Sequence, residues 1–340
     1  MKTKENKAIT LVSLVVTIVI LLILAGITIS SLTNSSLLEK TKEANEKTQD
    51  MQEKEKIKLA IISNHANNLS ENDIDKTQIE KELNNQTSEN NFSIKDNKDG
   101  TFLVKSNKSQ KEYYINNDGE IIDESNILKI NTLDELKEFR NNVNLGNNYN
   151  GWYIYLTNNI QMDINETWEP IGLHRLRYGG EQNQPFSGTF DGNEYEIDYM
   201  KIDALSYNGL FGFVKNGTVK NLGIGAHCDM KECEGATHVG GVVGFLFNNS
   251  IIQNCYNLSD ISGNTSKEVG GIVGSTNLNC EILNCYNKGN IKASTEENIN
   301  TTTCVGGIVG NLINGKIENC YNGGTIQTSR RSRYCWKYIK

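Results

Sequence analysis

Four residues of the types that bind zinc lie within one twelve-residue segment of this chain. His227, Cys228, Cys233 and His238 belong to the segment HCDMKECEGATH, and two histidines with two cysteines can hold zinc tetrahedrally. Their spacing matches none of the common zinc-finger patterns. The sequence therefore leaves open a zinc site, a loop with unpaired cysteines, and a Cys228–Cys233 disulfide.

A second group of cysteines occupies equivalent positions in a repeated box. Cys255, Cys285 and Cys320 each stand second in a copy of Asn-Cys-Tyr-Asn. If the copies stack at the ~4.8 Å spacing of neighbouring strands, a disulfide between adjacent cysteines is sterically allowed. We favour the alternative, a column of reduced, buried thiols that pack as small apolar side chains.

Acidic residues are the remaining candidates for chemistry. Asp191, Asp198 and Asp203 are close in the sequence, and clustered carboxylates are what a polysaccharide hydrolase or lyase would use. Asp191 stands in an Asp-Gly-Asn turn, where the carboxylate is expected to bond its own backbone. The chain contains no HExxH, GxSxG or P-loop motif. We therefore expect that the protein is not an enzyme and needs no cofactor.

The formal net charge of -7 argues against a nucleic-acid partner, since no basic face is available to replace the counterions of phosphates.

The elements that must position these residues come from an internal repeat. Three segments of the form VGG(V/I)VG end at Gly244, Gly274 and Gly310, and an Asn-Cys-Tyr-Asn box starts 10, 10 and 9 residues after them. A degenerate earlier copy has its closing glycine and its asparagine 9 residues apart. The closing glycines and first asparagines of the four copies are Gly212 and Asn221, Gly244 and Asn254, Gly274 and Asn284, and Gly310 and Asn319.

This repeat predicts the fold of the C-terminal part. Successive closing glycines are 32, 30 and 36 residues apart, and such a period indicates a solenoid. The short β-branched runs between Gly and Asn predict strands. We expect an all-β, right-handed parallel β-helix with three short strands per coil, apolar side chains and Cys inside, and Asn and Gly where the backbone turns with φ > 0.

The repeats closely resemble the GLUG repeat of exported bacterial proteins. Upstream, Leu133–Phe139, Trp168–Gly172 and Phe186–Asn193 resemble the opening coils of clostridial surface β-helix proteins, so the resemblance covers residues 126–328. It implies a cell-surface binding, adhesion or structural protein with an unknown protein or glycan ligand. Leu133–Phe139 is expected to form a short helix that caps the solenoid and protects its strand edge.

The N-terminus contains a candidate membrane span. Residues 9–29 run for 21 positions without a charge, which is about 30 Å of helix and matches a bilayer core. Lys2, Lys4 and Lys7 precede it, so the positive-inside rule places residues 1–8 in the cytoplasm and the rest outside. We expect a single-pass membrane protein.

The same segment resembles the prepilin-type N-terminus of type IV pilins and pseudopilins, especially the clostridial ones. The resemblance implies cleavage by a prepilin peptidase between Ala8 and Ile9, and a minor pilin that uses the pilin-type assembly machinery as an alternative function. The family usually has Gly where Ala8 stands and Glu where Ser13 stands. We therefore expect a pilin-like tether and not a polymerised pilus.

Residues 30–125 read as a helical stalk followed by a small strand-rich module. Helices are expected at 36–62 and around 73–84, strands at 92–94, 101–104 and 112–115, and hairpin turns at Asp99-Gly100 and Asp118-Gly119. A long helix with an antiparallel sheet is the α+β layout of a pilin-like module. A small α+β spacer without that ancestry is the alternative.

Residues 329–340 break the repeat with a basic, aromatic tail. Either a frameshift has replaced further repeats, or the tail is genuine.

Overall fold

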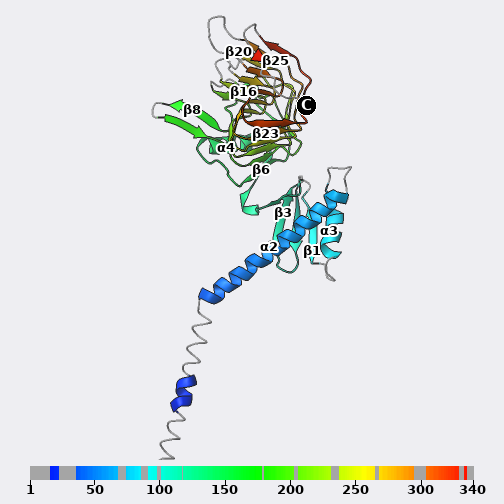
Figure 1. Ribbon diagram of the computed structural model, residues 1–340, viewed down its shortest axis with the longest axis vertical. Coiled ribbons are helices and arrows are strands. Elements are labelled where there is room, and N and C mark those ends of the chain that lie inside the picture. Colours follow the sequence, from blue (N-terminus) through cyan, green and yellow to red (C-terminus); the bar gives the residue numbers. More distant parts are fainter. Residues whose placement is uncertain are drawn as a thin grey trace, which may run out of the picture. The chain divides into compact units, whose positions relative to one another are not determined.

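The computed structural model describes residues 16–22, 36–67, 74–85, 91–97, 101–116, 118–177, 180–202, 206–230, 237–264, 268–294, 304–328 and 333–334. The chain forms two compact units, Met1–Ile121 and Ile122–Lys340 (Figure 1). Of the expected membrane span, residues 16–22 are described, and they are helical. None of the helices in the described ranges is long and apolar enough to cross a membrane. Ala8, Ile9 and Ser13 lie outside the described residues.

The first unit consists of two helices and an antiparallel sheet. Its elements are α2 (Ser36–Asn67), α3 (Lys76–Asn85), β1 (Phe92–Asp96), β2 (Thr101–Ser106), β3 (Glu112–Asn116) and β4 (Ile121–Ile122), with the sheet order β1-β2-β3-β4. The predicted helices and three strands are confirmed. The Asp99-Gly100 turn lies outside the described residues, and Gly119 in the next turn has a φ of 79°.

Spacing along α2 explains why this helix packs against the sheet. Ile57, Ala60, Ile61 and Asn64 follow helical periodicity and are all buried, so they form one face. This face shares a core with α3 and with the inward side chains of the sheet, among them Phe102.

The second unit is a parallel β-solenoid, as predicted. One coil runs through β16 (His238–Gly240), β17 (Val243–Phe247), β18 (Ile251–Gln253), β19 (Tyr256–Asn257) and β20 (Ile261–Asn264). The next coil repeats them as β21 (Glu268–Gly270), β22 (Val273–Asn277), β23 (Cys280–Leu283), β24 (Tyr286–Asn287) and β25 (Ile291–Ser294), in parallel register. The expectation of three strands per coil was wrong, because the paired glycines split one run into β16 and β17 and the Asn-Cys bend splits another into β18 and β19.

The other coils continue the same sheets. The following coil has β26 (Cys304–Gly306), β27 (Val309–Leu312), β28 (Gly315–Glu318), β29 (Tyr321–Asn322) and β30 (Ile326–Thr328), and β31 (Arg333–Tyr334) pairs with β26. The earlier strands are β5 (Ile127–Ile130), β6 (Tyr153–Leu156), β7 (Ile160–Gln161), β10 (Thr189–Asp191), β11 (Glu196–Asp198), β12 (Tyr207–Asn208), β13 (Phe211–Lys215), β14 (Thr218–Lys220) and β15 (Gly223–Ile224). An antiparallel hairpin, β8 (Leu173–Arg177) and β9 (Gly180–Gln184), is inserted between them.

A helix packs against the first coils, as predicted for Leu133–Phe139. α4 (Leu133–Asn144) is longer than expected and starts with a capping box in which Thr132 and Glu135 bond each other's backbone N–H groups. Its Phe139 ring lies 5.7 Å from the ring of Phe186 and 5.9 Å from that of Phe190. The helix therefore continues the apolar interior of the solenoid at its N-terminal end.

Candidate functional site

Side chains at equivalent repeat positions form columns along the solenoid. The exposed column consists of the first asparagines of the boxes. The side-chain amide of Asn254 donates to the side-chain oxygen of Asn221 (2.9 Å), Asn284 donates to Asn254 (3.2 Å), and Asn319 donates to Asn284 (3.2 Å). All four have φ between 51° and 54°. The prediction of left-handed asparagines is confirmed, and their amides also bond the coils together.

The closing glycines have a different role from the one expected. None of Gly212, Gly244, Gly274 and Gly310 has a positive φ, and all four lie against backbone atoms of neighbouring coils. A Cβ on Gly310 would be 2.6 Å from the carbonyl oxygen of Gly274. Glycine is required here for close approach of the backbones and not for a left-handed turn.

The last asparagines of the boxes form a second column, which lies against the VGG(V/I)VG segments. The amide of Asn257 donates to the side-chain oxygen of Asn287 (2.8 Å), which in turn donates to Asn322 (2.7 Å). Asn287 also lies against Gly271, where a Cβ would be 2.4 Å from its Cγ. The second glycine of VGG(V/I)VG thus leaves room for the last asparagine of the box. Sequence reasoning missed this partnership, although both residues recur in every clear copy.

The cysteines of the box form an interior column, as predicted. The backbone N–H of Cys255 donates to Sγ of Cys285 (3.4 Å), and that of Cys285 donates to Sγ of Cys320 (3.3 Å). The three are free thiols and no more than 8 % exposed. Hydrogen bonding to Cys255 and burial raise the pKa of the Cys285 thiol well above its usual range. These thiols pack as apolar side chains that also accept hydrogen bonds.

The tyrosines of the box stack on the outside of the solenoid and were also missed as a feature. The rings of Tyr256 and Tyr286 are 5.1 Å apart and within 6° of parallel, and those of Tyr286 and Tyr321 are 5.2 Å apart and within 9°. The hydroxyl of Tyr256 donates to the carboxylate of Glu196 (3.2 Å). Tyr321 is 51 % exposed. Each tyrosine of this column stands two residues after an exposed asparagine of the same box.

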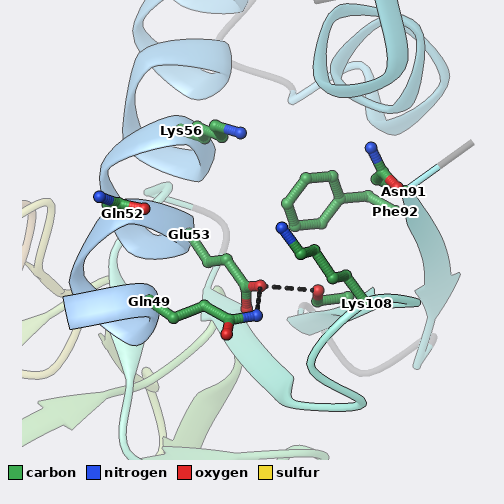
Figure 2. A pocket seen from close by; sticks show the side chains of 8 residues that line it. Gln49, Gln52, Glu53, Lys56, Asn91, Phe92 and Lys108 are labelled. Atoms are coloured by element: carbon green, nitrogen blue, oxygen red, sulfur yellow. Dashed lines mark hydrogen bonds between the residues drawn. The ribbon is translucent and has the colours of Figure 1, made fainter. Parts of the chain in front are cut away.

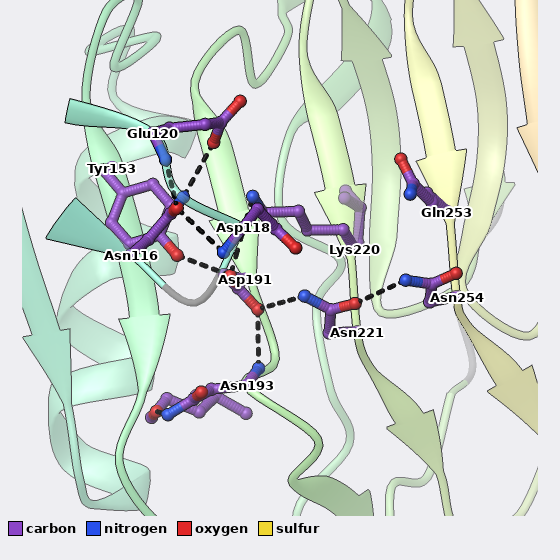
Figure 3. Close-up of polar contacts among 12 residues, drawn as sticks. Asn116, Asp118, Glu120, Tyr153, Asp191, Asn193, Lys220, Asn221, Gln253 and Asn254 are labelled. Atoms are coloured by element: carbon purple, nitrogen blue, oxygen red, sulfur yellow. Dashed lines mark hydrogen bonds and ion pairs between the residues drawn. The ribbon is translucent and has the colours of Figure 1, made fainter. Parts of the chain in front are cut away.

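The carboxylate of Asp191 ends the asparagine column (Figure 3). It accepts hydrogen bonds from the backbone N–H of Asn193 (2.7 Å), the amide of Asn221 (3.0 Å) and the hydroxyl of Tyr153 (2.5 Å). The predicted bond to its own turn is therefore confirmed. Burial raises the pKa of Asp191, while the ammonium of Lys220, 3.7 Å away, opposes the shift. We interpret Asp191 as the first member of the column.

The histidines of the proposed zinc set have separate carboxylate partners. His227 Nδ1 lies 2.6 Å from Asp198, whereas His238 Nδ1 lies 2.5 Å from Glu268 in the next coil. Burial would raise the pKa of Asp198, but hydrogen bonds from His227 and from the backbone lower it overall. The imidazole of His227 also stacks on Tyr199, with 4.9 Å between the rings.

The thiol of Cys228 is buried beside Asp198, 3.8 Å from the carboxylate, and burial raises its pKa to about 12. Cys233 and Asp203 lie outside the described residues. In the part of the chain that is described, no three or more His, Cys, Asp or Glu side chains form a group that could hold a metal ion. The four-residue zinc site stays a prediction, and the described geometry assigns His227 and His238 to different pairs.

A comparison with known protein families supports the repeat that the sequence analysis identified. The family model of the GLUG motif matches residues 235–262 and 301–327. The intervening coil pairs with both matched segments residue by residue, with Val269 between Val239 and Val305. No curated protein and no solved structure matches the chain. The second unit is thus a parallel β-solenoid in which two segments match the GLUG motif, and it follows a unit of two helices and a small antiparallel sheet.

Proposed function

We propose that this protein is a membrane-anchored, cell-surface β-helix that binds a protein or glycan ligand or serves as a structural surface element. The observation that supports the proposal best is the stacking of GLUG repeats into continuous columns. A solenoid of this kind presents an extended, regular outer surface, here with a tyrosine column and a column of exposed asparagines that stand two residues apart in each box. Exported bacterial proteins carry the repeats that it resembles.

The anchor in this proposal is the apolar segment at 9–29. Between residues 16 and 22, six apolar side chains are 47 to 67 % exposed, a surface that favours an apolar environment over water. In this arrangement residues 1–8 are cytoplasmic and both folded units are extracellular. Protease treatment of intact cells tests the orientation: both units should be removed, and full protection would refute it.

A minor pilin or pseudopilin is the alternative function. The long helix α2 and the sheet β1-β2-β3-β4 follow the layout expected of a pilin-like module. This alternative requires a prepilin peptidase to cut between Ala8 and Ile9. Mass spectrometry of the mature protein would find Ile9 as the N-terminal residue if it does, and an intact leader would refute the alternative.

Ligand binding is tested with the full-length chain in detergent micelles on a panel of glycans and extracellular proteins. Replacement of the exposed Tyr321 by alanine should weaken binding of a ligand that uses the tyrosine column. Leu145→Ala is a matched control, since Leu145 is 83 % exposed and lies after α4. Product analysis belongs in the same experiment, because cleavage of a glycan would replace this proposal with a carbohydrate-active enzyme.

A further inference from the structure

The first unit contains a pocket of about 130 Å³ between α2 and the antiparallel sheet (Figure 2). Its lining residues are Gln49, Gln52, Glu53 and Lys56 from α2, and Asn91, Phe92, Ser106 and Lys108 from β1, β2 and the residues beside them. This volume is well below the roughly 300–1,000 Å³ of pockets that enclose a drug-sized ligand. It suits one small functional group and not an extended ligand.

The buried carboxylate in the lining has no free capacity. One oxygen of Glu53 accepts hydrogen bonds from the hydroxyl of Ser106 (3.0 Å) and the amide of Gln49 (3.1 Å), and the other from the hydroxyls of Ser109 (2.6 Å) and Tyr113 (2.9 Å). A carboxylate offers about four lone-pair positions, and all are occupied. Glu53 therefore joins the helix to the sheet and leaves no acceptor for a cationic ligand.

The unused groups of the pocket are cations and amides. The ammonium groups of Lys56 and Lys108 have no ion-pair partner among the described residues, although other lysines of the unit, such as Lys54 and Lys111, are paired with Asp50. Figure 2 shows both free side chains directed toward the space in front of the Phe92 ring. Two ammonium groups against the single carboxylate of Glu53 leave the lining with a net positive charge, which favours a negatively charged occupant.

We propose that this pocket binds a carboxylate carried on a short apolar stem, such as the side chain of a glutamate on a partner protein. The carboxylate would lie between Lys56 and Lys108, and the stem would contact the Phe92 ring. Lysine binds anions as a point charge, so the apolar wall has to provide the preference for a carboxylate over inorganic phosphate. The site is independent of the solenoid and of the function proposed for it.

Calorimetric titration of the full-length chain in detergent micelles tests the proposal. Propionate should bind saturably, and its neutral analogue propionamide should not. Lys56→Gln and Lys108→Gln should each weaken propionate binding about two- to fivefold, as expected for a solvent-exposed ion pair. Lys58→Gln is the matched control, since Lys58 is an exposed lysine of α2 that does not line the pocket.

Three results would overturn the inference. Equal binding of propionate and propionamide would show that charge plays no part. Unchanged affinity in the Lys56→Gln, Lys108→Gln double variant would place the anion elsewhere. Tighter binding of inorganic phosphate than of propionate would show a site that recognises charge alone and would refute the carboxylate assignment. Because both lysines are exposed, the variants should keep the melting temperature of the native protein, which the same samples report.

Discussion

Replacement of Gly274 by alanine should destabilise the solenoid strongly. A Cβ at this position would lie 2.5 Å from the carbonyl oxygen of Gly244, 2.6 Å from the backbone nitrogen of Val239 and 3.0 Å from the carbonyl carbon of His238. All three atoms belong to the backbone of the preceding coil. No side-chain rotation can relieve the contacts, so the two coils have to separate.

The size of the effect follows from these distances. Carbon atoms in contact are normally ~3.5–4.0 Å from their neighbours, so the coils must move apart by about 1 Å at this point. Overpacking of a well-packed region costs about 1–3 kcal/mol of stability. We expect a cost near the upper end of this range, because the added Cβ meets only backbone atoms, which cannot rotate away. In a unit of this size each kcal/mol lowers Tm by about 2–4 °C, so Gly274→Ala should lower it by about 6–12 °C.

The matched control is Gly323→Ala. The nearest atoms to a Cβ there are the Asn287 carbonyl oxygen and Lys288 Cγ, both at 3.8 Å, which is an ordinary contact. In thermal unfolding followed by far-UV circular dichroism, the Tm of Gly323→Ala should equal that of the native protein or be slightly higher. A small increase is expected because alanine lowers the conformational entropy of the unfolded chain. A Gly274→Ala protein that melts within 1 °C of the native one, or a Gly323→Ala protein that is equally destabilised, would refute the close-approach argument.

The side-chain columns and the carboxylate–imidazole pair predict three further effects. In urea unfolding, Asn284→Gly should be about 1–2 kcal/mol less destabilising than Asn284→Ala, because both lose the column amide but only alanine is strained at a φ of 54°; equal losses would contradict this. Burial opposes the shift, but the close contact with the His238 imidazole lowers the pKa of Glu268 below 4.5, so the pair stabilises the fold above about pH 4.5 and less as the pH falls further. The free energy of unfolding of Glu268→Gln should therefore fall less steeply than that of the native protein as the pH drops below about 4.5. An unchanged dependence of this free energy on pH would argue against the pair. A thiol reagent should label the half-exposed Cys304 in the native protein and Cys285 only after unfolding; a disulfide at Cys285 would contradict the free-thiol structure.

The cysteine column and the turn positions of the asparagines could be predicted because the solenoid repeats its own local chemistry. A residue that recurs at one repeat position must stack on its equivalents once the coils are in register. This is why Cys255 could be assigned to a column from spacing alone. The left-handed backbone of Asn254 follows from the residue type, since asparagine tolerates that conformation better than most residues.

Pairs of side chains that are not part of the repeated motif could be identified only from the tertiary structure. Asp198 and His227 stood in two different candidate sites, one acidic and one metal-binding, and the stacking of their coils joins them in one pair. No repeated motif of the sequence contains Asp198 or His227, so spacing gave no signal for their pairing, which depends on how the two coils stack. His238 and Glu268 are a different case, since each stands directly before a VGG(V/I)VG segment and the register of β16 with β21 places them opposite each other. Only the structure shows that their side chains form a pair.

The repeats, by their spacing and residue types, determined that this chain builds a solenoid with asparagines at its turns and a column of buried cysteines. Only the tertiary structure decided why Gly244 and Gly274 must be glycines and which asparagine Gly271 accommodates. The physical reason is that a period in the sequence predicts which residues stack, whereas the distance between two backbones depends on how closely neighbouring coils pack.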